Sequence, residues 1–395
     1  MSSSFKVEYQ KKELPKKIFN IGISLFAVGL ILSAIGYFVD STRSSFNNIV
    51  LLMFLISIGL GSMFLVAVEY VAGADWSVPF RRIAEFFAAV LLAVPVVAVP
   101  LLFNLGNIFH WMHPEIVNMD KILIGKAPYL NTTFFIIRVI IFFALWILFY
   151  FLITRNSLKQ DQSADQNLTR KNIKISAVFI PVFAITITFA AIDWMMSLEP
   201  HWFSTIFGIY YFSGSVLAGL SVITIAAILL NKNGYLVKGI SNENYYSLGA
   251  LLFAFTNFWA YIAFSQYLLI WYANLPEETF WFLQRWEGGW MYFSIGLLLL
   301  HFLVPYVLLL SQPSKTDPKR LLIASSVILF SHIYDIYWIV KPNFSKQSVM
   351  LGWNELGFLL LAAGIVILVF VFKTHKNNFV AIGDPKLKRG IDFRL

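Results

Sequence analysis

Ten long apolar segments, separated by short polar ones, constrain this chain of 395 residues more than any other feature. A helix needs about 20 residues to cross a hydrocarbon core of about 30 Å, and each segment is long enough. With 58% hydrophobic and 13% charged residues, the chain is an integral membrane protein and not a soluble globule. We therefore predict an all-α polytopic membrane protein with ten transmembrane helices, at residues 18–39, 46–72, 79–103, 131–154, 173–197, 203–230, 245–273, 287–311, 319–341 and 349–372.

The distribution of Lys and Arg predicts the orientation. Of these 30 residues, 23 lie in the N-terminal tail 1–17, in the loops after the second, fourth, sixth and eighth helices together with the adjoining helix ends, and in the C-terminal tail 373–395. An excess of Lys and Arg marks the cytoplasmic side, so we expect both tails to be cytoplasmic. The basic loop 155–172 is expected to have no fold of its own. The net charge of +9 follows from this bias and indicates no nucleic-acid partner.

Metal and haem sites are not favoured. The chain has no cysteine, which excludes protein-ligated iron–sulfur clusters, c-type haem attachment and internal disulfides. His110 and His113 lie in the longest external loop, 104–130, where further metal ligands are missing. The aromatic and Met-rich composition of this loop favours docking of an extracytoplasmic partner. His301 and His332 invite a b-type haem, but their expected depths differ and there is no second pair. We predict no catalytic residue, no metal and no cofactor on this chain, and expect bound lipids.

Two opposite charges are predicted inside neighbouring helices. Asp193 lies about 6 Å, and Arg138 about 10 Å, below the outer ends of their helices. An ion pair at this depth either locks the two helices together or belongs to a hydrophilic pathway, and both interpretations stay open. Glu85 follows Arg81 and Arg82 by about one turn, and there a structural ion pair is the favoured interpretation.

The surroundings of Asp193 recur near the end of the chain. Asp335 precedes Pro342 by the same seven positions as Asp193 precedes Pro200, with a Trp between them in both copies. The copies lie four helices apart, so both run in the same direction and the repeats are parallel. We predict two four-helix bundles, 46–197 and 203–341, flanked by the helices 18–39 and 349–372. Unlike Asp193, Asp335 has no arginine on the preceding helix, which makes it the better candidate for a group that changes protonation.

The depths of the ionisable residues fit a proton pathway. The candidates are Glu69 and Glu85 near the cytoplasmic side, Arg138, Asp193, His332, Asp335 and Glu355 near the outer side, and between them His301 and the polar stripe Asn257, Tyr261 and Ser265. Two aqueous half-channels meeting near the midplane need such a distribution, because one continuous wire would short-circuit the membrane potential. Helix-locking contacts are the open alternative for all of them, and interhelical hydrogen bonds are the favoured interpretation for the stripe.

Two segments closely resemble a known family. They are residues 73–85, Gly-Ala-Asp-Trp-Ser-Val-Pro-Phe-Arg-Arg-Ile-Ala-Glu, and residues 193–208, Asp-Trp-Met-Met-Ser-Leu-Glu-Pro-His-Trp-Phe-Ser-Thr-Ile-Phe-Gly. Both resemble the polysulphide-reductase NrfD-like membrane family, and within it the F-type subunits (ActF) of bacterial alternative complex III, a quinol:cytochrome c or quinol:acceptor oxidoreductase. The resemblance covers essentially the whole chain. It implies ten helices in two bundles and a place in the bacterial inner (plasma) membrane.

The resemblance implies a respiratory membrane subunit that supports quinol oxidation without a redox cofactor of its own. Expected partners are a homologous quinol-binding membrane subunit, extracytoplasmic iron–sulfur and cytochrome c subunits and a terminal oxidase, with quinol, haem c and iron–sulfur clusters bound by these partners. Quinol-binding relatives have a His where this chain has Phe203. A quinol oxidation site needs a proton acceptor, so we expect no tightly bound quinol here.

Two other functions are kept as alternatives. The first is a quinol-binding NrfD-like membrane anchor. The second is a stand-alone secondary transporter, which would also have parallel repeats and buried carboxylates. The sequence has no pair of strongly Gly/Pro-broken helices at matching midplane positions, a feature that transporters commonly use to bind substrate.

Overall fold

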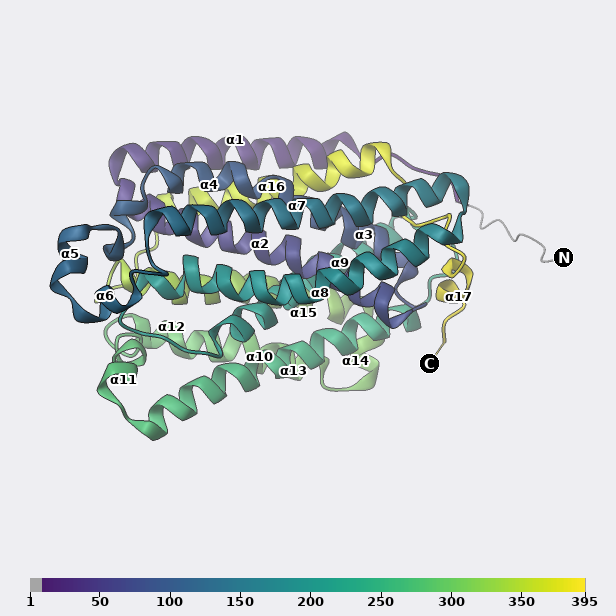
Figure 1. Ribbon diagram of the computed structural model, residues 1–395. Helices are drawn as coiled ribbons and strands as arrows, with labels where there is room; N and C mark the ends of the chain where they lie inside the picture. Colours follow the sequence, from purple (N-terminus) through teal and green to yellow (C-terminus); the bar gives the residue numbers. More distant parts are fainter. Residues whose placement is uncertain (1–8, 395) are drawn as a thin grey trace.

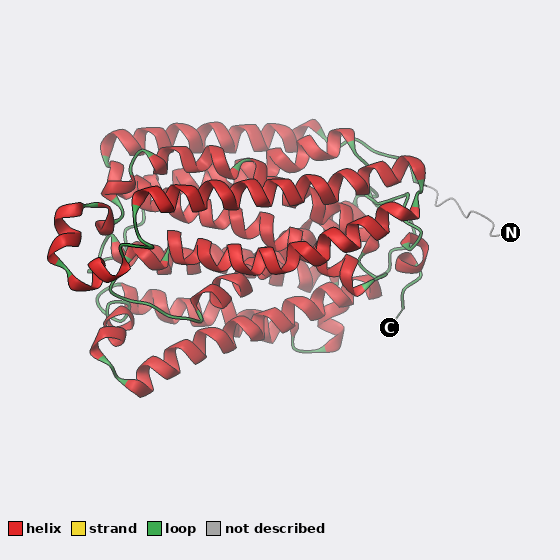
Figure 2. Cartoon of the chain, in the orientation of Figure 1, coloured by secondary structure: helices red, strands yellow, loops and turns green. Residues whose placement is uncertain are grey.

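The structure of the protein, a computed structural model, describes residues 9–394. These residues form helices and no strand (Figure 2). Ten helical spans among them are long and apolar enough to cross a membrane, which confirms the predicted number and a multi-pass membrane protein. Residues 1–8 of the predicted tail 1–17 lie outside the described residues.

The ten spans run back and forth between two faces of one bundle (Figure 1). They are α1 (Lys16–Val39), α2 (Ser41–Ala72), α3 (Val78–Ala88) with η1 (Ala89–Leu92) and α4 (Val94–Leu102), α7 (Thr132–Ser163), α8 (Gln166–Trp194) with η4 (Met196–Leu198), α9 (Phe207–Lys232), η5 (Asn242–Tyr245) with α10 (Tyr246–Ala273), α12 (Trp290–Leu297) with η6 (Leu298–Leu303) and α13 (Val304–Leu309), α15 (Pro318–Val340) with η7 (Lys341–Asn343), and α16 (Trp353–Lys376).

Short helices lie at the two faces. The distal face carries η2 (Leu105–Asn107), η3 (His110–Met112), α5 (Pro114–Met119), α6 (Lys121–Lys126) and α11 (Pro276–Leu283), and the opposite one, here the terminal face, carries α14 (Gln312–Thr316) and α17 (Leu387–Ile391) (Figure 1). The helix α1 begins, and α16 ends, at the terminal face. Because the number of spans is even, the first span begins and the last span ends on the same side of the bundle.

The predicted loop 155–172 is wrong, because α7 and α8 continue through its polar residues. Only Ala164 and Asp165 separate the two helices. Ala164 adopts a left-handed conformation (φ 52°) and ends α7, and the Asp165 side chain caps α8 by accepting from the backbone N–H of Asn167. Polar side chains join the parts of the two helices that extend beyond their apolar residues. For example, Asn156 Nδ2 donates to Asn172 Oδ1 at 2.9 Å. Hydropathy marks the membrane-embedded part of a helix and not its end.

Prolines interrupt two of the spans. Pro95 lies in the first turn of α4, after the 3₁₀ turn η1, at a position where a proline ring fits a helix without the loss of a hydrogen bond. Pro305, at the start of α13, follows the π-helix η6, whose wider turn carries His301. Within this turn the Leu300 carbonyl accepts a hydrogen bond from Ser331 Oγ of α15 at 2.8 Å. The wide turn is therefore anchored to the neighbouring helix.

The helices α2 and α9 form the centre of the bundle and are buried along most of their length. They cross closely where Gly61 faces Ser215 and Gly219. A Cβ atom added to Gly219 would lie 2.6 Å from the carbonyl carbon of Gly61, so only glycine fits this crossing. The helices α8 and α15 pack on this pair, and α1 lies along α16 at the outside of the bundle.

The C-terminal tail 373–395, predicted as a cytoplasmic tail, packs against the bundle over its described part. Phe379, Val380 and Leu387 are buried under the terminal face. Asn244 Nδ2 donates to the Gly390 carbonyl at 2.8 Å, which attaches α17 to the start of α10. This segment therefore covers the terminal ends of the spans.

Candidate functional site

The most unusual polar group in the interior is the carboxyl of Asp335, on α15, which is 2% exposed. The phenol of Tyr210, on α9, donates to its Oδ1 at 2.5 Å, and the indole Nε1 of Trp259, on α10, donates to its Oδ2 at 3.1 Å. Both donors are neutral. Among the described residues the only basic group within 4 Å is His301, whose Nδ1 lies 3.8 Å from Oδ2. A charge on Asp335 therefore has no fixed cation beside it.

Two histidines complete this group, which we call the aspartate–histidine cluster (Asp335, Tyr210, Trp259, His301 and His332). His301 lies on the π-helix and stacks on Trp259, with ring centroids 4.0 Å apart. His332 lies one turn before Asp335, and its ring centroid is 6.2 Å from that of His301. Both rings are buried, and all four of their nitrogens lack a hydrogen-bond partner in residues 9–394. Buried nitrogens without a protein partner are places where water or a transferable proton binds.

Three members of this cluster, Asp335, His332 and His301, were predicted as candidates, and the structure brings them together. Sequence reasoning missed the donors Tyr210 and Trp259. The chain contains 17 Tyr and 12 Trp, so no pattern distinguishes these two from the rest. The position of Tyr210 in the sequence is the one signal that could have pointed to it. This residue lies only ten positions after Pro200, where the first copy of the Asp-to-Pro motif ends.

A line of hydroxyls continues from the cluster along the α2–α9 crossing. The imidazole of His332 lies against Gly214, where an added Cβ would be 2.7 Å from its Nδ1. At the next residue of α9, Ser215 Oγ lies 3.1 Å from Ser57 Oγ, which lies 3.0 Å from the phenol oxygen of Tyr211. Each serine hydroxyl is also within hydrogen-bond distance of a carbonyl of its own helix, and Tyr211 donates to the Met53 carbonyl at 2.6 Å. Further toward the terminal face, the same two helices carry buried hydroxyls without a hydrogen-bond partner in the described chain, on Ser62, Tyr70, Ser221 and Thr224.

The predicted stripe of Asn257, Tyr261 and Ser265 does not lie in the interior. Tyr261 is 65% exposed, and Tyr272, at the end of the stripe, is 83% exposed. The amide of Asn257 donates only to the Phe253 carbonyl of its own helix. The interhelical hydrogen bonds expected for the stripe are therefore not formed among residues 9–394. The hydroxyls of α2 and α9 take the place in the middle of the membrane that the stripe was expected to have.

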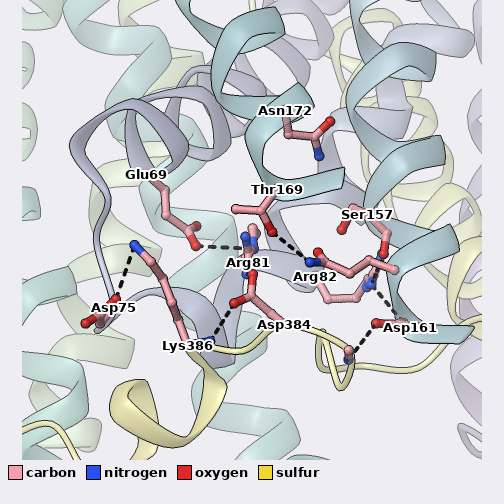
Figure 3. A network of polar contacts seen from close by, with 12 residues as sticks. Glu69, Asp75, Arg81, Arg82, Ser157, Asp161, Thr169, Asn172, Asp384 and Lys386 are labelled. Atoms are coloured by element: carbon pink, nitrogen blue, oxygen red, sulfur yellow. Dashed lines mark hydrogen bonds and ion pairs between the residues drawn. The ribbon is translucent and has the colours of Figure 1, made fainter. Parts of the chain in front are cut away.

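An ion network closes the terminal face (Figure 3). Glu69 Oε1 lies 3.2 Å from Arg81 Nε, and Arg81 also forms an ion pair with Asp384 of the C-terminal segment. Arg82 donates to Glu85 at 2.7 Å and to Asp161 at 2.8 Å. The predicted pair between Glu85 and one of the two arginines is thus present. Asp161 and Asp384 were missed, because both lie in segments that were expected to be unstructured.

A cavity gives access to this network from the side. It has a volume of about 210 Å³, lies between α2, α3, α9 and α10, and is lined by Glu69, Ser77, Arg81 and apolar side chains that include Leu220 and Ile223 of α9. Glu69 therefore has one side in the ion network and one side on a cavity. It is the acidic residue that lies nearest to the terminal end of the hydroxyl line on α2.

The predicted ion pair between Arg138 and Asp193 is present near the distal face. Arg138 Nε and Nη2 donate to the two carboxylate oxygens of Asp193 at 2.8 and 2.9 Å, and the phenol of Tyr129 donates to Oδ1 at 2.9 Å. Burial, and then the negative charge of Asp193, raise the pKa of Tyr129. This bidentate pair with a neutral hydroxyl is fully satisfied, as is typical of a contact that locks helices.

The second half of the chain uses its arginine differently. Arg285 is fully buried and donates to the backbone carbonyls of Trp281 and of Trp338 and Ile339 at the distal end of α15. It thereby satisfies carbonyls that a helix end leaves without partners. Asp335 is left without the arginine that Asp193 has.

Glu355, the last predicted candidate, belongs to an ion cluster at the distal face. It accepts from Arg43 Nε and Nη2 at 2.9 and 2.6 Å and from Lys341 Nζ at 3.1 Å. Asn47 Nδ2 donates to it as well, at 3.1 Å. These residues come from α2, η7 and α16. The structure does not bring Glu355 together with the aspartate–histidine cluster.

The loop 104–130 folds onto the segment after α8. Trp111 is buried and its Nε1 donates to the Ser197 carbonyl, and Lys126 Nζ donates to the Pro200 carbonyl at 2.5 Å. His113 Nε2 lies 2.8 Å from the Gly106 carbonyl oxygen, so this ring nitrogen has a backbone partner. Within residues 9–394 no group of three His, Cys, Asp or Glu side chains could hold a metal ion. The apolar groups that remain exposed here include Met119 and Ile122.

No known protein-family model matches this chain, and a search of curated proteins finds no match to it.

Proposed function

We propose that this chain is a membrane subunit of a bacterial respiratory quinol-oxidising complex of the alternative complex III type, and that it conducts protons without a redox cofactor of its own. The observation that carries the proton part is the aspartate–histidine cluster. Asp335 has two neutral donors and no fixed cation, and His301 and His332 present unpartnered nitrogens beside it. The assignment to a respiratory complex rests on the resemblance of residues 73–85 and 193–208. Catalysis belongs to the partner subunits.

A proton route follows from the arrangement of polar groups. A proton enters at Glu69 from the lateral cavity, passes along the hydroxyls of α2 and α9, and reaches His332 and Asp335. Water bound at the unpartnered hydroxyls bridges the gaps between them. The cluster is the point where the terminal and distal halves of the route meet. Protonation of Asp335 then breaks no ion pair with a lysine or arginine in the described chain.

The proposal includes the orientation and the repeat. The terminal face is cytoplasmic, because most Lys and Arg residues lie there. Residues 46–197 and 203–341 are two parallel four-helix bundles. In support of the repeat, the carbonyls of the two prolines of the repeated motif accept from side chains of the segments before the fourth and the eighth span, Pro200 from Lys126 and Pro342 from Gln284.

The partners in this proposal hold the redox groups. They are a homologous quinol-binding membrane subunit, extracytoplasmic iron–sulfur and cytochrome c subunits that bind haem c, and a terminal oxidase. The exposed apolar residues of α5 and α6 are the surface offered to the extracytoplasmic subunits. Deletion of 114–126 should release these subunits while the helices stay folded. A complex that stays intact after the deletion would contradict the proposal that α5 and α6 dock these subunits.

Native electrophoresis of solubilised membranes tests the complex itself. The proposal predicts that the chain migrates in a large assembly that contains haem and iron–sulfur proteins. A single band of the size of this chain, without such partners, would favour the stand-alone transporter.

A photoreactive quinone analogue tests the alternative of a quinol-binding anchor. Phe203 is 53% exposed and offers no proton acceptor where quinol-binding relatives have a His. We expect no labelling around Phe203 and Asp193. Labelling there that excess quinone suppresses would favour the anchor.

The proton part can be tested with His332→Phe, which keeps a ring of similar size but removes both nitrogens. The expected result is fewer protons ejected per electron, with the complex still assembled. Tyr261→Phe is the matched control, because Tyr261 lies on the outer surface of α10. Equal proton stoichiometry in both variants would make His332 a structural residue.

A further inference from the structure

A large cavity lies beside the aspartate–histidine cluster. Its volume is about 620 Å³, within the range of sites that enclose a small molecule, and it lies between α10, α11 and α12. Aromatic side chains form most of its wall, including Trp259, Trp281, Phe302 and Trp338, and no charged side chain lines it. A molecule that fits this cavity is uncharged, and the part of it that the cavity encloses is largely apolar.

One buried polar group faces this cavity without a partner. Gln266, on α10, is 5% exposed and lines the cavity, and its Nε2 has no hydrogen-bond partner among the described residues. An unpaired amide donor in an apolar site is costly, so a ligand with a hydrogen-bond acceptor gains binding energy there. Ser294, another polar residue of the lining, has partners within the chain, since its Oγ donates to the Arg285 carbonyl and accepts from Trp338.

The mouth of the cavity opens toward the membrane. The lining residues Tyr261, Phe264 and Leu298 are 65%, 60% and 53% exposed, and they belong to two membrane spans, α10 and the helix that begins with α12. Close by, Trp271 and Tyr272 are exposed near the distal end of α10, as expected of aromatic anchors at a membrane interface. Lipid is therefore the molecule with direct access.

Gln266 lies near the distal boundary of the hydrocarbon core. The helix α10 has 28 residues and is about 42 Å long, so it extends about 6 Å beyond each side of a core of about 30 Å. Gln266 lies seven residues before Ala273, about 10 Å from the distal end of the helix. Its amide is therefore about 4 Å inside the hydrocarbon boundary. The ester carbonyls of phospholipids lie just outside this boundary, so a lipid that enters the cavity can bring one of them to the amide.

We propose that this cavity is a binding site for one phospholipid of the distal leaflet, whose ester carbonyl accepts a hydrogen bond from Gln266 Nε2 and whose acyl chain fills the aromatic pocket. The inner end of the pocket is formed by Tyr210 and Trp259, the two donors to Asp335. The bound chain therefore covers these donors and keeps membrane-side water away from the cluster. The lipid site itself does not depend on the proposed proton function.

A diester phospholipid with a photoreactive group near the end of one acyl chain tests the site on the purified full chain. We expect labelling of peptides that contain Trp259 or Phe302. The substitution Ala263→Trp, which fills the cavity, should abolish this labelling. The matched control is Ala254→Trp on the same helix, because Ala254 is exposed and does not line the cavity, and it should leave the labelling unchanged. Equal labelling in both variants would overturn the site.

The role of Gln266 is tested by comparing the diester lipid with its diether analogue, which has no carbonyl. The native chain should bind the diester about fivefold more tightly, the size expected for one neutral hydrogen bond, and Gln266→Leu should remove this preference. No preference in the native chain would overturn the carbonyl contact. Suppression of the labelling by equimolar short-chain quinone, but not by excess phospholipid, would assign the pocket to a quinone and overturn the lipid proposal.

Discussion

Tyr210 of α9 donates its phenol hydrogen to the carboxyl of Asp335 on α15, and no lysine or arginine lies within 4 Å of that carboxyl in the described chain. The matching aspartate of the first half, Asp193, accepts from a different tyrosine, Tyr129, and in addition from a bidentate arginine, Arg138. The charge of one aspartate is therefore fixed by a partner. The other can gain or lose a proton without breaking an ion pair.

The first prediction concerns the phenol of Tyr210. Tyr210→Phe removes one of the two donors to Asp335 and leaves a buried carboxyl oxygen unsatisfied. We expect a loss of about 1–3 kcal/mol in the free energy of unfolding, measured by thermal denaturation in detergent. Tyr261→Phe, at an exposed phenol of α10, should change the stability by less than about 0.5 kcal/mol. Equal effects of the two substitutions would contradict the contact.

The pair of Arg138 and Asp193 should show strong coupling. Asp193→Ala leaves the Arg138 guanidinium buried without its partner, at an expected cost of about 3–5 kcal/mol. The double variant with Arg138→Leu should recover part of this loss, because no unpaired charge remains. A double-mutant cycle on the unfolding free energies measures the coupling. Additive effects would mean that the two residues act independently.

The crossing of α2 and α9 should not tolerate a side chain at Gly61. Gly61→Leu would place its side chain against the backbone of Ser215 and Gly219 and force the helices apart. We expect a chain that does not assemble, or that assembles with a markedly lower melting temperature. Gly125→Ala is the control, since nothing lies within 4 Å of a Cβ added there. Normal stability of the Gly61 variant would show that the helices cross elsewhere.

The C-terminal segment should come loose when its ion pair is removed. Asp384 lies against Arg81, and Lys386 Nζ donates to the Gly73 carbonyl at 2.6 Å. Asp384→Ala leaves Arg81 with Glu69 alone, so amide hydrogen exchange in residues 379–391 should accelerate at least tenfold. Glu115→Ala, at an exposed acidic residue of the distal face, should leave this exchange unchanged. Unchanged protection in the Asp384 variant would show that apolar packing alone holds the segment.

Acid should weaken the attachment of the loop 104–130. Asp120 Oδ2 lies 2.5 Å from His201 Nε2, and this hydrogen bond lowers the pKa of Asp120. A carboxyl whose pKa is lower in the folded state contributes stability above its unfolded pKa of about 3.9, and this is lost as the pH falls through the lower, folded value. Hydrogen exchange in 114–126 should therefore rise below about pH 4. In Asp120→Asn the hydrogen exchange of 114–126 should be high already at pH 7. If acid still raised the exchange of this variant as much as that of the native chain, Asp120 would be excluded as the cause.

Hydropathy and charge distribution were sufficient to predict the number of spans and the ion pair of Arg138 with Asp193, because both depend on residues within one segment or on depth along neighbouring helices. The ends of α7 and α8 could not be predicted in this way. Helix caps such as Asp165 and polar contacts such as that of Asn156 with Asn172 extend helices beyond the apolar region.

The donors to Asp335 and the ions of the terminal face could not be predicted for a different reason. The cluster combines side chains from three helices, those of Tyr210, Trp259 and Asp335. The sequence contains no distances between helices, so it cannot show which helix faces meet. Asp384 lies in the C-terminal segment, and its partner Arg81 is far away in the sequence and also pairs with Glu69, so no local pattern indicates the contact. The stripe on α10 was misplaced because its period identifies one face of a helix but not whether that face points inward.

The measurement that tests the proton route most directly is the number of protons ejected per electron by the purified complex in liposomes, with Asp335→Asn in this subunit. Asparagine keeps the shape and can still accept from Tyr210 through its oxygen, but its Nδ2 cannot accept from Trp259 and the amide cannot exchange a proton. We predict that quinol oxidation continues and that the proton number per electron falls to that released by the chemistry alone. An unchanged proton number at full electron flow would contradict conduction through Asp335 and leave the cluster with a structural role.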